Sequence, residues 1–125
     1  MSVAGTPSKL LLDGESFDLI ADADFTLDRT KFTKEQIETS GEPIVKTKKN
    51  TQIVEGEIAC NSKKYESLMN KVNGLSDITL SVTLADGSIY KSKGQVSAEP
   101  WSAQDNKCKI KIIPTTADGW TAFPV

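Results

Sequence analysis

The chain has 125 residues, of which 38% are hydrophobic and 26% charged, and its formal net charge is -2. This length suits one domain with a buried core, spanning residues 1–125, and is too short for two. The charge gives no support for general nucleic-acid affinity, which depends on clustered positive charge. No apolar run reaches the roughly 20 residues that cross a bilayer, and the N-terminus lacks a signal-peptide pattern. We therefore expect a protein made and kept in a cytoplasm.

The N-terminal part of the chain predicts a β-hairpin followed by an acidic strand. Residues 9–12 and 16–20 are apolar runs on either side of Asp13-Gly14, a dipeptide that favours the positive φ angles of a tight hairpin turn. Residues 22–28 then alternate strictly between apolar and polar side chains, as in a half-buried strand. The polar face of this strand carries Asp22, Asp24 and Asp28.

Residues 29–50 form a long polar arm with few large apolar side chains. Connections inside compact domains usually have about 4–6 residues, and unstructured ones beyond about 12–15 are mostly functional or disordered. Because the arm buries little of itself, the entropy cost of ordering it calls for another chain to hold it. We expect strand-like contact at residues 42–46, with nearby lysines as an electrostatic anchor. The expected contact residues are Glu42, Pro43, Ile44, Val45, Lys46, Lys48 and Lys49.

A further strand and the only predicted helix follow the arm. Residues 51–60 alternate less sharply and place Glu55 and Glu57 opposite an apolar face. Residues 61–74 show an apolar stripe at helical spacing, which is typical of a helix packed on a sheet rather than of a ligand site. Asn61 or Ser62 suits the N-cap, and Gly74 suits a left-handed residue after the last turn.

The second half of the chain predicts more strands. Residues 78–85 alternate, Asp86-Gly87 predicts a turn, and the returning strand contains Gly94, a candidate bulge or bend. Residues 99–102 break this strand. The last strand, residues 107–113, directs three apolar side chains to one face and Lys107, Lys109 and Lys111 to the other. The tail, residues 114–125, shows little periodicity, although Trp120 and Phe123 suggest docking on the domain or on a neighbour.

The sequence offers little for catalysis. The chain has no histidine, the commonest general base and metal ligand, and its two cysteines, Cys60 and Cys108, consequently have no histidine partner for a nucleophilic dyad. We expect both cysteines to be buried, reduced thiols. Asp13-Gly14-Glu15 fails the calcium-loop pattern, and no phosphate-binding glycine motif occurs. We therefore expect neither an enzyme nor a protein that holds a metal or cofactor.

The order of these elements resembles that of the tail tube proteins of long-tailed bacteriophages, particularly those with contractile, Mu-like tails. Three stretches carry the resemblance: Ser8 to Gly14, Ile58 to Cys60 with the helix after it, and Ile78 to Ser102. It covers nearly the whole chain, although residues 120–125 have no counterpart, and it rests on pattern without an invariant motif.

The resemblance implies a mainly β fold, a small antiparallel β-sandwich or barrel with one flanking helix. It also implies a structural virion protein: six copies form a ring, and rings stack into a hollow tail tube that conducts genomic DNA without specific binding. Sheath, baseplate and terminator proteins would be its partners, and the arm would reach an adjacent subunit or ring. No catalytic residues are carried over.

The charged strand faces then acquire possible roles. Asp22, Asp24, Asp28, Glu55 and Glu57 are candidates to line the channel, because carboxylates repel DNA phosphates mildly; an outer solvated surface explains them equally well. The lysine row at 107, 109 and 111 is a candidate outer or intersubunit face, or else a solvated edge that guards against aggregation.

Two other functions stay open at this point. One is a terminator, hub or initiator protein of the tail with the same fold. The other is a stand-alone β-sandwich binding module that uses the arm as a recognition loop.

Overall fold

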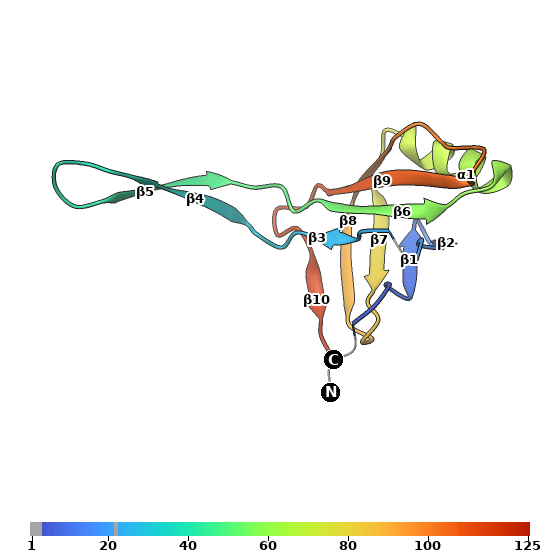
Figure 1. Ribbon diagram of the computed structural model, residues 1–125, viewed down its shortest axis with the longest axis horizontal. Coiled ribbons are helices and arrows are strands. Elements are labelled where there is room, and N and C mark those ends of the chain that lie inside the picture. The colour runs from blue at the N-terminus through green and yellow to red at the C-terminus, as the bar shows by residue number, and fades with distance from the viewer. Residues whose placement is uncertain (1–3, 22) are drawn as a thin grey trace.

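A computed structural model describes residues 4–21 and 23–125 of the chain, which form ten strands and one helix (Figure 1). The helix, α1 (Ser62–Val72), lies between β6 and β7 in the chain. The strands are β1 (Lys9–Leu12), β2 (Glu15–Phe17), β3 (Thr26–Leu27), β4 (Phe32–Ile37), β5 (Ile44–Lys49), β6 (Val54–Ala59), β7 (Ile78–Thr83), β8 (Ile89–Ala98), β9 (Lys107–Pro114) and β10 (Thr121–Phe123).

The main sheet is antiparallel and folds back on itself. Its strand order is β2-β1-β7-β8-β9-β6-β3, and β10 also pairs with β8. The segment that continues β2 reaches β6: Ala59 N donates to Asp18 O at 2.8 Å, and Ile20 N donates to Glu57 O at 2.9 Å. These bonds connect the two ends of the sheet into a small barrel. The predicted fold class, mainly β with antiparallel strands and one flanking helix, is confirmed.

Strand β8 joins the two halves of this barrel. Its residues 89–94 pair with β7, and its residues 94–98 pair with β9. In Figure 1, β6 and β9 run across the direction of β7 and β8. Gly94 belongs to both pairings, and a Cβ there would lie 2.1 Å from the Ile113 carbonyl oxygen. The glycine is therefore required by close backbone approach; the register runs through it continuously, without the bulge considered from the sequence.

The core collects the inward-facing side chains of the alternating strands. In β9, Cys108, Ile110 and Ile112 are buried while the lysines between them are exposed, as the sequence pattern predicts. Trp120 is 2% exposed, and its Nε1 donates to Gln52 O at 2.8 Å. The fully buried residues are Leu10, Leu12, Phe17, Val54, Ile58, Cys60, Leu68, Leu80, Val82, Cys108, Ile112 and Trp120.

The two Asp-Gly turns differ in backbone conformation. Asp13 and Gly14 both have positive φ (54° and 82°), which confirms the tight hairpin turn between β1 and β2. In the second turn, Gly87 has positive φ (94°) and its N–H donates to Leu84 O at 3.0 Å. Gly87 therefore supplies the left-handed residue that leads the chain back into β8.

Helix α1 begins as predicted but ends differently. The Asn61 side chain caps it by accepting a hydrogen bond from Lys64 N at 2.9 Å. At the other end, Asn73 keeps a right-handed conformation and donates its N–H to Met69 O. The prediction of a left-handed Gly74 is wrong, because Asn73 closes the last turn without it. On the inner side Leu68 is buried, and Tyr65 stacks on Trp101 with ring centroids 4.7 Å apart.

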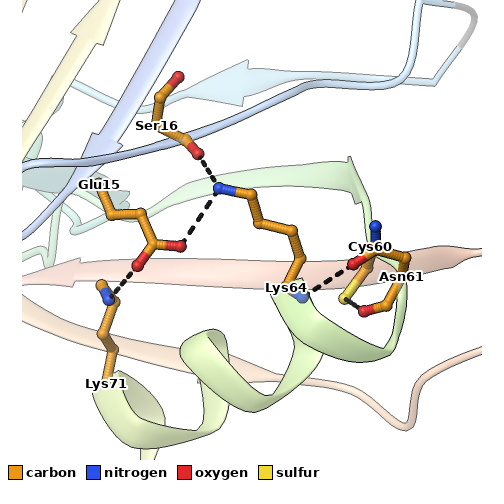
Figure 2. A network of polar contacts seen from close by, with 6 residues as sticks. All are labelled: Glu15, Ser16, Cys60, Asn61, Lys64 and Lys71. Atoms are coloured by element: carbon orange, nitrogen blue, oxygen red, sulfur yellow. Dashed lines mark hydrogen bonds and ion pairs between the residues drawn. The ribbon is translucent and has the colours of Figure 1, made fainter.

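Glu15 ties the first hairpin to this helix (Figure 2). Its carboxylate accepts hydrogen bonds from Lys71 Nζ at 3.0 Å and from Lys64 Nζ at 3.2 Å, and Lys64 also donates to Ser16 O at 2.7 Å. Both lysines also approach the face of the Phe17 ring. The hydrogen bond from Lys71, followed by that from Lys64, holds the pKa of Glu15 below its usual range.

Because of the ion pairs of Glu15 with Lys64 and Lys71, the stability of the fold should decrease at acid pH. Because the pKa of Glu15 is lowered by folding, its contribution is present above the unfolded pKa and is lost as the pH falls through the folded value. We expect Glu15→Gln to lower the free energy of unfolding by about 0.5–1 kcal/mol at pH 7 and by progressively less below pH 4. Urea unfolding at pH 7 and at a pH below 4 measures this difference. Glu66→Gln, at an exposed position of the same helix, is the matched control. An equal effect at both pH values would contradict the assignment.

Two further regions differ from the sequence predictions. The acidic strand shortens to the two residues of β3, which pair with β6, and Asp22 lies outside the described residues. Its described neighbours Ala23 and Phe25 are half-buried without joining the ladder. The tail is less irregular than expected, because Trp120 anchors it and Thr121–Phe123 pair with the first residues of β8.

Candidate assembly surfaces

Residues 32–49 form a β-hairpin that projects away from the barrel (Figure 1). Strands β4 and β5 pair with each other over six residues, from Phe32 opposite Lys49 to Ile37 opposite Ile44. The two strands of the arm thus pair with each other, which was not expected from the sequence. The expected strand at residues 42–46 is shifted: Glu42 and Pro43 lie in the terminal loop, and the strand covers Ile44–Lys49.

Every residue of β4 and β5 is exposed, including the large apolar ones. Ile37 and Ile44, 41% and 56% exposed, lie opposite each other near the tip, and the adjacent Val45 is 60% exposed. An isolated two-stranded hairpin is marginally stable in water. The barrel covers none of these apolar side chains.

The hairpin is fixed to the barrel by polar contacts at its base. Asn50 Nδ2 donates to Asp28 Oδ2 at 3.0 Å and to Thr30 O at 2.7 Å, and Thr30 N donates to Asp28 Oδ1 at 2.7 Å. These donors, with Asn50 first, lower the pKa of Asp28. Asp28 therefore has a local structural role, which its candidacy as a channel-lining residue did not foresee.

The remaining described acidic candidates share a face with the lysine row. Strands β6 and β9 place Glu55 opposite Lys111 and Glu57 opposite Lys109. Lys111 Nζ lies 3.6 Å from Glu55 Oε1, in an exposed ion pair. The antiparallel register of β6 and β9 brings these alternating charges together on one face, so the acids and the lysines cannot be divided between a channel lining and an outer surface.

The same face carries a shallow depression of about 600 Å³. Small residues of three segments, Ala23, Gly56 and Ala98, form part of its lining. Its charged lining consists of Asp24, Glu55, Glu57, Glu99, Lys109 and Lys111. Lys107 is exposed at the start of β9, opposite Ala59, and does not line the depression. Four carboxylates and two ammonium groups make a mixed surface with an acidic excess.

A second, smaller hollow lies at the base of the hairpin. It has a volume of about 140 Å³ and is lined in part by Lys31, Lys49, Gln52 and Thr116. Gln52 is 5% exposed, and its Oε1 has no hydrogen-bond partner within residues 4–21 and 23–125. This hollow was not expected from the sequence, because Gln52 follows the polar arm and nothing in its neighbours distinguishes it from a surface residue.

The described residues contain no group of three or more His, Cys, Asp or Glu side chains arranged to hold a metal ion. Within the same residues, no helix is both long and apolar enough to span a membrane. Cys60 and Cys108 are buried free thiols, as predicted, and burial raises the pKa of both, which keeps them protonated.

Neither a family model nor a curated protein matches this chain.

Proposed function

We propose that the chain is a structural subunit that assembles with copies of itself into rings, and that the rings stack into the hollow tube of a phage tail. The projecting hairpin is the observation that carries this proposal. The hairpin consists of six pairs of exposed residues, with Ile37, Ile44 and Val45 near its tip, and the barrel of the same copy does not cover them.

The barrel supplies a rigid body for such an assembly. Its core is continuous, and its sheet closes through residues 18–20, so the hairpin can be held by another copy without rearranging the fold. The outer strands β3 and β10 are short, which leaves few unpaired backbone groups for indiscriminate edge pairing. Contacts between copies are then left to the hairpin and to charged faces.

The mixed face of β6 and β9 suits a channel for DNA. A conduit must not bind its cargo, and lysines free to contact phosphate would slow sliding. Here Lys111 is paired with Glu55, and Lys109 lies opposite Glu57, within an acidic excess. In the proposed virion, sheath, baseplate and terminator proteins would contact other surfaces of the tube.

Microscopy of the purified protein tests the proposal directly. We expect negative-stain images to show rings or tubes with a central channel at high protein concentration. Rings that never stack would favour a terminator, hub or initiator of the tail instead. A species that stays monomeric at every concentration, checked by sedimentation velocity, would contradict self-assembly and favour a stand-alone binding module.

A further inference from the structure

Charge is distributed unevenly along the hairpin. Residues 29–50 contain six basic and three acidic residues, whereas the rest of the chain contains nine basic and fourteen acidic ones. Within the hairpin, Glu38 and Glu42 lie in the loop between β4 and β5, which is its tip. Lys31, Lys48 and Lys49 lie at the opposite end, next to the barrel. The hairpin therefore has an acidic tip and a basic base.

The tip is an ordered turn. Thr39 Oγ1 donates to Glu42 O at 2.7 Å and accepts a hydrogen bond from Gly41 N at 3.1 Å. These bonds bring the chain segments around Glu38 and Glu42 together, and residues 38–43 are all exposed. The tip thus presents two carboxylates, together with the hydroxyl and backbone N–H of Ser40 as hydrogen-bond donors.

The base hollow has the complementary groups. Lys31 and Lys49 line it, and the Gln52 amide lies buried below with an unpartnered oxygen among the described residues. Gln52 cannot easily move away, because Trp120 Nε1 holds its carbonyl and its side-chain amide packs against Gly119. A Cβ at Gly119 would lie 2.6 Å from this amide. A buried polar atom without a partner needs an explanation, and an incoming donor provides one.

We propose that the hairpin tip of one copy docks in the hollow at the hairpin base of the next copy. Glu38 and Glu42 face Lys31 and Lys49, and a donor of residues 39–41 reaches Gln52 Oε1. This inference rests on the proposed function, because it names the surface by which neighbouring subunits hold each other. Tip and base are different surfaces, so the contact is head-to-tail, and such a contact either closes into a ring or repeats along an axis.

The ion pair within one copy does not oppose this docking. Lys31 Nζ lies 3.6 Å from Asp118 Oδ1, and the two side chains are 50% and 91% exposed. Such an exposed pair contributes little to stability. Lys31 can therefore turn from Asp118 to a carboxylate of the neighbouring copy at small cost.

Paired charge reversals test the contact. The tip variant is Glu38→Lys with Glu42→Lys, and the base variant is Lys31→Glu with Lys49→Glu. We expect each variant alone to pellet at least about tenfold less on ultracentrifugation than the wild type, because both ends of every contact then carry the same charge sign. An equimolar mixture should pellet again, since the basic tip of the first variant matches the acidic base of the second, and the acidic tip of the second matches the basic base of the first.

The control reverses two exposed lysines elsewhere, Lys9→Glu with Lys63→Glu, and should assemble like the wild type. Far-ultraviolet circular dichroism checks that each variant is folded. Assembly of either single variant at wild-type level, or a folded mixture that fails to pellet, would overturn the tip-to-base contact while the tube proposal stands. A wild type that never assembles would overturn both.

Discussion

Removing the hairpin should leave the barrel folded and abolish the assembly. In the deletion variant, Asn-Gly replaces residues 32–49. The ends of the excised segment suit this turn, because Asn50 N donates to Lys31 O at 3.0 Å, which is the bond that closes a two-residue hairpin loop. Asn-Gly also favours the positive φ angles that such a loop requires.

The barrel should tolerate this deletion because the hairpin contributes nothing to the core. All residues of β4 and β5 are exposed, and the anchoring bonds of Asp28, Thr30 and Asn50 remain in the variant. We expect the midpoint of thermal unfolding to change by no more than about 4–8 °C, the shift that corresponds to about 1 kcal/mol in a domain of this size.

Assembly should be lost because the variant lacks the exposed apolar residues as well as the acidic tip. Negative-stain microscopy and ultracentrifugation of the folded variant measure this. The full-length protein under the same conditions is the control. Tubes formed by the deletion variant would show that the barrel faces alone hold the copies together.

The strand pattern of the barrel could be predicted because alternation encodes burial. In β9 every second side chain enters the core, and in β6 the buried Val54 and Ile58 lie on the other face from Glu55, which is exposed, and Glu57, which is half-buried. The Asp13-Gly14 turn could be predicted as well, because the positive φ angles of a tight turn favour this dipeptide. The prediction of a long acidic strand was wrong: residues 23–25 keep the alternation of burial, but only Thr26 and Leu27 pair with another strand.

The shared charged face could not be predicted from the sequence. Each strand reveals which of its side chains point outward, but not which strand lies beside it. That β6 pairs with β9, with Glu55 opposite Lys111, depends on a contact between residues far apart in the chain. The hollow at the hairpin base has the same origin, since it combines Gln52 with the loop of residues 114–119.

The hairpin shows a different limit. Its strands lack an apolar face, because no core receives them, and the usual signal for strands is therefore weak. What the sequence did indicate was a segment too long and too polar for an ordinary connection. Self-pairing lowers the ordering cost that argued for a holder, yet the exposure of Ile44 and Val45 still leaves apolar surface without cover.

Substituting Gly94 should damage the barrel more than any surface change. At this residue β8 passes from pairing with β7 to pairing with β9, and a Cβ would lie 2.1 Å from Ile113 O and 2.8 Å from Pro114 Cα. Both atoms belong to backbone, so no side-chain rotation makes room. Overpacking in a core typically costs about 1–3 kcal/mol, and a backbone clash places Gly94→Ala at or above the upper end.

Gly41→Ala is the matched control for Gly94→Ala. Gly41 lies in the exposed hairpin tip, where a Cβ would meet only Thr39 Oγ1, at 4.0 Å, and its φ is outside the left-handed region. Urea unfolding should therefore give a large loss of stability for Gly94→Ala and a change within about 0.5 kcal/mol for Gly41→Ala. Equal stability of the two variants would mean that β8 and β9 move apart at Gly94 without cost. The passage of β8 from β7 to β9 would then not require a glycine.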